Sequence, residues 1–152
     1  MKFLRSSPAA FLSARERERV VGAIRDAESR TSGEVRVCLE RRCPGGADPL
    51  ARAAEHLARL GMTRTALRNG VLIYVALADR RFAILGDEGI HERVGEAAWG
   101  RIRDGLAARF GAGAFCEGIC EAVTRAGELL SSSFPRQTGD VNELPDEISI
   151  EE

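Results

Sequence analysis

The alternation of apolar and polar positions along the chain predicts about four helices and three strands. Ser13, followed three residues later by Glu16, is a capping-box signature for the start of a helix. Apolar residues then recur at helical spacing, and we expect Gly33 to close this helix in a left-handed conformation. The same periodicity predicts three further helices near residues 49–60, 94–110 and 115–130.

Three short segments favour strands, namely residues 34–40, 71–78 and 82–86. The first contains β-branched Val35 and Val37, whereas the second is apolar on both faces, as in an inner strand covered from both sides. A helix separates these two strands, so we expect them to be parallel. The polar break Asp79-Arg80-Arg81 is too short for a crossover, so the second and third strands should form a hairpin with Asp79 in its turn.

The order of these elements is typical of a single α/β domain, and 152 residues are enough for one substantial core. We expect an N-terminal arm over residues 1–11, the domain over residues 12–134 and an acidic tail over residues 135–152. The tail combines scattered apolar residues with acids. It is therefore either disordered or an extended arm that lies along the body.

The distribution of charge and the length of the longest apolar segment argue against a nucleic-acid partner and against membrane insertion. The tail has six acidic residues and one basic residue, which leaves 21 bases and 17 acids in the body. These bases are neither clustered nor interleaved with aromatic rings, so we expect no nucleic-acid partner. The longest apolar run, Val71 to Ala78, is far shorter than the roughly 20 residues of a membrane helix, so we expect no membrane insertion.

The remaining reactive residue types suggest structural roles. No export signal is apparent, so we expect a cytoplasmic protein whose four cysteines stay reduced. Cys116 and Cys120 share a helical face with Ile119, which favours burial as small hydrophobic residues over zinc binding. His56, beside Leu57, is expected at the surface or its rim. Serine-hydrolase, P-loop and dinucleotide-binding motifs are absent from the sequence.

Four short motifs occur in order along the chain: Thr31-Ser32-Gly33-Glu34, Arg68-Asn69-Gly70-Val71-Leu72, Ala78-Asp79-Arg80 and Gly86-Asp87-Glu88-Gly89. Together they resemble the TPM domain, a family named for thylakoid-lumen, photosystem and acetylcholine-receptor-modulating founders, over about residues 12–130. The resemblance implies a three-layer α/β/α sandwich with a small mixed sheet. It also implies acid phosphatase activity, as in some members, or calcium binding, as in others. The chain departs from the family pattern at Arg68, where Asp is usual, and at His91, where Glu is usual.

Strand geometry, independently of the family, predicts that three loops converge at one edge of the sheet. The first two strands start at this edge, and the third strand ends there. Counting outward from the turn places His91 opposite Asn69. We call the converging residues 32–34, 68–70 and 86–92 the loop cluster.

The polar side chains of the loop cluster suggest two kinds of chemistry. The candidate ligands for Ca²⁺ or Mg²⁺ are Glu34, Asn69, Asp87, Glu88 and His91. Glu34 and Asp87 are also the candidate catalytic carboxylates, and Arg68 is a candidate phosphate clamp.

Two functions therefore remain open at this point, beside purely structural roles for the same residues. The first is a binding or assembly module, with a divalent-cation site in the loop cluster and a protein partner at the loop cluster or the acidic tail. The alternative is a metal-dependent acid phosphatase that acts on phosphomonoesters. In the structural interpretation, Glu34 pairs with an arginine, Asp87 and Glu88 form a turn, and His91 caps a helix.

Overall fold

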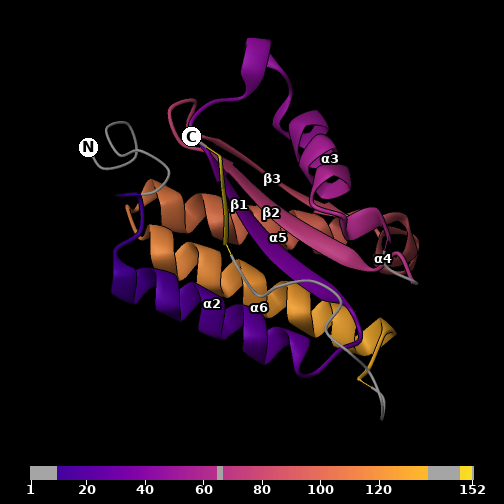
Figure 1. The fold of residues 1–152 in the computed structure, drawn as a ribbon. Helices are drawn as coiled ribbons and strands as arrows, with labels where there is room; N and C mark the ends of the chain where they lie inside the picture. The colour runs from indigo at the N-terminus through magenta and orange to yellow at the C-terminus, as the bar shows by residue number, and fades with distance from the viewer. Residues whose placement is uncertain (1–9, 65–66, 137–147, 152) are drawn as a thin grey trace.

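Three layers make up the part of the chain that the computed structural model describes, residues 10–64, 67–136 and 148–151. The elements in chain order are α2 (Ala14–Glu28), β1 (Glu34–Glu40), α3 (Pro49–Arg59), β2 (Gly70–Ala76), β3 (Arg81–Gly86), α4 (Glu88–Val94), α5 (Glu96–Gly111), α6 (Phe115–Ser133) and β4 (Ile148–Glu151). Helices α2, α5 and α6 cover one face of the sheet, and α3 lies on the other (Figure 1). The prediction of an α/β/α sandwich with a small mixed sheet is confirmed.

The sheet has the strand order β3-β2-β1-β4. β1 runs parallel to both β2 and β4, whereas β2 and β3 are antiparallel, so both the parallel crossover and the hairpin are confirmed. Every residue of β1 and β2 is buried, as expected for inner strands with helices on both sides. Glu34 pairs with Gly70 at one end of these strands, and Glu40 pairs with Ala76 at the other.

The hairpin register differs from the one expected from the sequence. Val71 lies opposite Gly86, and the amide of Asp87 donates to the carbonyl of Gly70 at 2.8 Å. The chain then turns into α4, so the prediction that His91 lies opposite Asn69 is wrong. This helix was not predicted because its seven residues are too few for an apolar periodicity to stand out.

The C-terminal residues add a fourth strand that was not predicted. Ile148 pairs with Val37, and Ile150 pairs with Leu39, along the outer edge of β1. For residues 148–151 the extended alternative for the tail therefore holds, while residues 137–147 and 152 lie outside the described part of the chain. At the other terminus, Phe11 of the expected arm is buried, with its ring centroid 5.2 Å from that of Phe115; residues 1–9 are also outside the description.

Two apolar cores hold the layers together. The larger one lies between the sheet and α2, α5 and α6, and the smaller one lies between the sheet and α3. Ser13 and Glu16 form the predicted capping box at the start of α2, with N–O distances of 3.0 and 3.1 Å. Among the described residues, none of the helices combines the length and the apolar character needed to cross a membrane.

The contact of α2 with α6 depends on a residue without a side chain. A Cβ atom added at Gly127 would lie 2.6 Å from the Cβ of Ala27, whereas nothing lies within 4 Å of one added at Gly22. We predict that Gly127→Ala lowers the free energy of unfolding by about 1–3 kcal/mol through overpacking. Gly22→Ala, on the exposed side of α2, should raise it by about 0.5–1 kcal/mol, because alanine has the higher helix propensity. Urea unfolding of both variants tests this, and equal effects would contradict the close helix contact.

Candidate functional site

The structure brings the three predicted loops together at one end of the sheet. Glu34 starts β1 beside Gly70, and the amide of Gly89 donates to the carbonyl of Arg68 at 2.8 Å. Gly33 is not left-handed, contrary to the prediction, because α2 already ends at Glu28. Its lack of a side chain serves close approach instead, since a Cβ there would lie 3.0 Å from the carbonyl oxygen of Asn69.

An ion pair dominates the polar chemistry of the loop cluster. The Nε and Nη2 atoms of Arg68 donate to the two carboxylate oxygens of Asp87 at 2.7 and 2.8 Å, and Nη1 lies 3.4 Å from Oε1 of Glu88. The hydrogen bond with Asp87 raises the pKa of Arg68. Asp87 also caps α4, because Oδ1 accepts from the amide of Glu88 at 2.8 Å. Arg68 holds this position with φ of 52°, which is unusual for a residue other than glycine.

Two further predicted residues lie buried beside this ion pair. Asn69 is only 1% exposed, and its side-chain nitrogen has no hydrogen-bond partner among the described residues. Glu34, at the start of β1, is 2% exposed. A buried donor that lacks a protein acceptor favours a bound water molecule or ligand oxygen at this position.

The other two predicted ligands are exposed to solvent rather than buried with Glu34 and Asn69. Glu88 is 67% exposed at its side chain, and His91 is an exposed residue in the middle of α4. In the described ranges, no three His, Cys, Asp or Glu side chains are grouped closely enough to hold a metal ion. The loops therefore converge as predicted, but their side chains do not form a cation cage as they stand.

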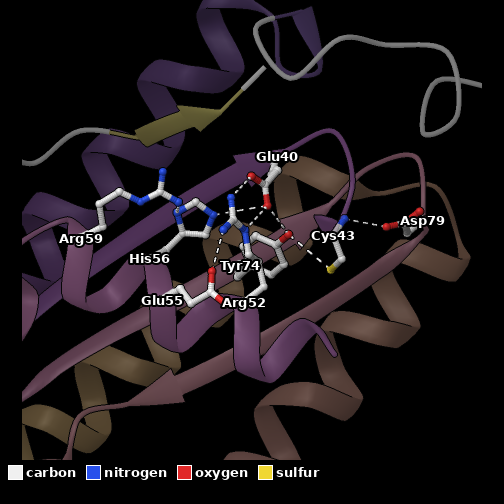
Figure 2. Close-up of polar contacts among 8 residues, drawn as sticks. All are labelled: Glu40, Cys43, Arg52, Glu55, His56, Arg59, Tyr74 and Asp79. Atoms are coloured by element: carbon white, nitrogen blue, oxygen red, sulfur yellow. Dashed lines mark hydrogen bonds and ion pairs between the residues drawn. The ribbon is translucent and has the colours of Figure 1, made fainter. Parts of the chain in front are cut away.

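A second polar constellation lies at the opposite end of β1, under α3 (Figure 2). Glu40, which is 6% exposed, accepts from Nε and Nη2 of Arg52 at 2.9 and 2.7 Å. Its Oε1 atom also accepts from the hydroxyl of Tyr74 at 2.7 Å and lies 3.3 Å from Nε2 of His56. We call these four residues the Glu40 network. Figure 2 shows them converging on the Glu40 carboxylate.

The protonation states of the Glu40 network follow from these contacts. Burial acts to raise the pKa of Glu40, but hydrogen bonds from Arg52, Tyr74 and His56 outweigh it and lower the pKa to about 2. Nη2 of Arg59 lies 3.4 Å from Nδ1 of His56. Because arginine is only a donor, this contact makes Nδ1 an acceptor and leaves the proton of a neutral imidazole on Nε2, facing Glu40.

The Glu40 network extends to the loops that follow β1 and β2. Sγ of Cys43 lies 3.4 Å from the hydroxyl of Tyr74, and the amide of Cys43 donates to Oδ2 of Asp79 at 2.7 Å. Burial, together with the bonds to Cys43 and Glu40, raises the pKa of Tyr74, so its hydroxyl stays protonated and able to donate. Asp79 thus joins two loops, in addition to its predicted place in the hairpin connection.

Comparison with known proteins identifies the family. A family model described as the TPM domain matches residues 6–129. The chain belongs to the TPM domain family. No curated protein matches the chain.

Solved structures share the TPM fold. The BA42 protein of the psychrophilic bacterium Bizionia argentinensis, determined by NMR, is 42% identical with a TM-score of 0.85, over 92% of this chain and 95% of that one. The N-terminal domain of the cg2496 protein from Corynebacterium glutamicum is 15% identical with a TM-score of 0.63, over 87% of this chain and 81% of that one. The N-terminal domain of a P. gingivalis protein is 23% identical with a TM-score of 0.65, over 81% of this chain and 78% of that one.

Within the TPM fold, this chain departs from the family pattern at the centre of the loop cluster. The residue before Asn69-Gly70, where the family resemblance implies an acid, is Arg68, and its guanidinium occupies both oxygens of Asp87. A divalent cation would have to displace this guanidinium to reach the carboxylate. The residues present therefore do not fit a cation site without a rearrangement.

The Glu40 network is what sequence reasoning missed. His56 was expected at the surface or rim, but it is fully buried, and its ring stacks on Tyr74 with centroids 5.5 Å apart. Two signals were available: Tyr74 is the one polar-tipped residue in an apolar strand, and Arg52 and His56 lie four residues apart on the crossover helix. The predicted burial of Cys116 and Cys120 holds fully for Cys116, where burial raises the pKa of the thiol, whereas Cys120 is only partly buried against the core.

The Glu40 network should contribute strongly to stability. We predict that Glu40→Gln lowers the free energy of unfolding by about 3 kcal/mol at pH 7, because it removes the buried one of the two carboxylates that pair with the largely buried Arg52. Glu55→Gln is the matched control: Glu55 also pairs with Arg52, at 2.8 Å, but is 62% exposed, so its loss should cost less than about 1 kcal/mol. Urea unfolding measures both, and equal costs would contradict the role of burial.

The same pair of proteins gives a pH test. The Glu40 pKa is lowered from its ordinary value of 4.5 to about 2, so the unfolded chain takes up the proton first as the pH falls. The stability advantage of the parent over Glu40→Gln should be complete above about pH 4.5 and be lost as the pH approaches 2. Unfolding curves at several pH values follow this difference, and a difference that stays constant over this range would contradict the lowered pKa.

Proposed function

We propose that this TPM domain is a binding or assembly module whose contact surface is the loop cluster with the adjoining Leu67. The observation that carries the proposal is the side chain of Leu67, which is 52% exposed at the edge of this cluster. Only one other large hydrophobic side chain among the described residues, Leu50, is comparably exposed. An apolar side chain surrounded by charged groups can form the centre of a protein interface that has a polar rim.

The backbone that carries Leu67 is held in place, which supports a role in recognition. A Cβ atom added at Gly89 would lie 2.2 Å from the carbonyl oxygen of Leu67, so the two loops are in close contact. The bidentate pair of Arg68 with Asp87 fixes the next residue as well. A surface that is ordered before binding loses less conformational entropy when its partner docks.

The charges around Leu67 favour a protein partner. Arg68, Glu88 and His91 are at least partly exposed, and they place both signs of charge around one apolar side chain. A nucleic acid would favour basic residues alone, whereas a mixed polar rim around an apolar centre is the usual composition of protein interfaces. The described part of the acidic tail, residues 148–151, is already paired with β1 as β4. The loop cluster is therefore the stronger candidate for the surface that contacts a protein partner.

The anchor role of Leu67 can be tested by comparing two exposed leucines. Leu67→Ser should reduce capture of the partner by about tenfold, because truncating an interface anchor costs more than about 1 kcal/mol. Leu50→Ser makes the same chemical change away from the loop cluster and should still retain the proteins that Leu67→Ser loses. Quantitative mass spectrometry of proteins retained from a lysate of the source organism measures this. Both variants should keep the parent melting temperature, and unchanged capture by Leu67→Ser would refute the proposed surface.

The second candidate function is a metal-dependent acid phosphatase acting on phosphomonoesters. It is favoured by the buried side-chain nitrogen of Asn69, a donor without a partner among the described residues and suited to a phosphate oxygen. Arg68 is the phosphate clamp in this reading, and Glu34 and Asp87 are the catalytic carboxylates. The engagement of Asp87 by Arg68 weighs against it, because the carboxylate is not available to a cation.

Cation binding separates the two candidates. Ca²⁺ and Mg²⁺ should not raise the melting temperature of the parent, since Arg68 already neutralises Asp87. In Arg68→Asp, which supplies the acid that the family resemblance implies, Ca²⁺ should raise the melting temperature by several degrees, because an ion at a hundredfold excess over its Kd stabilises the folded state by about 2.7 kcal/mol. Arg68→Gln is the control that removes the guanidinium without adding a carboxylate. A melting shift in the parent would instead support the cation site, and a phosphomonoester assay on Glu34→Gln and Asp87→Asn would then follow.

A further inference from the structure

The outer edge of β3 is an unpaired sheet edge. β3 is the last strand on its side of the sheet, and it pairs with β2 only. The hydrogen bond from the amide of Asp87 to the carbonyl of Gly70 determines which residues of β3 are hydrogen-bonded to β2. Because hydrogen-bonded pairs alternate in an antiparallel sheet, these residues are Leu85, Ala83 and Arg81. The amides and carbonyls of Phe82 and Ile84 therefore point away from β2, and among the described residues no backbone group pairs with them. Phe82 is half-buried and Ile84 is 3% exposed, so these groups lie at the bottom of a depression rather than on an open surface.

A groove follows this edge between two helices. Figure 1 places α3 on one side of β3 and α5 on the other. The groove has a volume of about 480 Å³, and its walls come from the start of α3, the first residues of β3 and the first turns of α5. Leu50, which is 47% exposed, lies on its α3 wall. The groove thus offers backbone hydrogen bonds along its floor and an apolar side chain on one wall.

The rim of the groove is basic. Three arginines, Arg80, Arg81 and Arg103, line it against two acids, Asp48 and Glu96; Arg103 is paired with Glu96, and Arg80 also has an interaction partner. Exposed Arg41 and Arg42 adjoin this end of the sheet. The loop that carries them is tied to the turn after β2, because the amide of Ala78 donates to the carbonyl of Arg41 at 2.7 Å. The two loops therefore carry several arginines at the end of the sheet where β3 starts, and of these Arg80 and Arg81 line the groove.

We propose that the β3 edge binds an extended acidic segment of a protein partner by strand addition. Outward backbone groups of Phe82 and Ile84 supply the hydrogen bonds, alternate side chains of the segment reach Leu50, and its acids meet the arginine rim. The domain already accepts such a segment at its opposite edge, where Ile148-Ser149-Ile150-Glu151 pairs with β1. This surface lies at the start of β3, whereas the loop cluster follows its end, so the inference does not depend on the proposed function.

The test uses capped peptides and amide chemical shifts of the full chain. A peptide of alternating Glu and Ile should shift the Phe82 and Ile84 amide signals in a saturable way, and more weakly at high salt. A peptide of equal length with Lys in place of Glu should not bind, because the rim repels it. The acidic peptide with N-methyl groups along one edge should also fail, since strand addition needs the backbone donors.

Charge-reversal variants locate the site. The double variant Arg80→Glu with Arg81→Glu should bind the acidic peptide about tenfold more weakly. Arg15→Glu with Arg101→Glu makes the same change of charge at exposed positions of α2 and α5 outside the groove, and should leave the affinity unchanged. Circular dichroism establishes that both double variants remain folded, and a misfolded groove variant is replaced by Arg81→Glu alone.

Several results would overturn the proposal. Shifts at Val37 and Leu39 in place of Phe82 and Ile84 would mean that the peptide replaces β4. Equal binding of the basic peptide would show that the arginine rim does not select acidic segments. If the acidic peptide at millimolar concentration caused no amide chemical-shift change, the β3 edge would not be a binding site. Self-association of the chain through Phe82 and Ile84 without peptide would assign the edge to a second copy instead.

Discussion

The parallel pairing of β1 with β2 is the constraint on which both polar sites depend. The two strands stay in register from Glu34 with Gly70 to Glu40 with Ala76, so the segments before them meet at one end and those after them meet at the other. The loop cluster forms at the first end and the Glu40 network at the second. Because both strands are buried on both faces, this register cannot slip without moving core residues into the wrong layer.

The two ends of the sheet neutralise their carboxylates in different ways. Glu40 is enclosed and receives donors from α3 and β2, so its ion pair fixes the position of α3. Asp87 is bound by Arg68, whose side chain is 38% exposed and whose backbone takes a left-handed conformation. In this TPM domain the loop cluster thus carries its own cation, a guanidinium, and Leu67 is displayed beside it. The proposal that the loop cluster recognises a partner rests on this arrangement.

Predictions from the sequence succeeded where a long segment had one consistent periodicity. The four long helices and three strands arose at or near the expected residues, and the convergence of three loops followed from strand order alone. The count that placed His91 opposite Asn69 failed because the β2–β3 pairing is shifted, with Val71 opposite Gly86, and because α4 begins directly after β3. The burial of His56 was not predicted because polar and apolar residues alternate beside it on the helix. This pattern does not indicate which residues of the sheet face it.

The apolar spacing along the chain was sufficient to establish the layers, the parallel crossover and the hairpin, because each depends on which local face is buried. The partners of the polar side chains were not available from that spacing. Arg68 reaches Asp87 across 19 positions, and Tyr74 reaches Glu40 across 34, through strand pairing and helix packing that bring distant segments together. Strand β4 depends in the same way on an edge of β1 that exists only after the sheet has formed. Fold class was thus a local property of this sequence, whereas the chemistry of its sites depended on register.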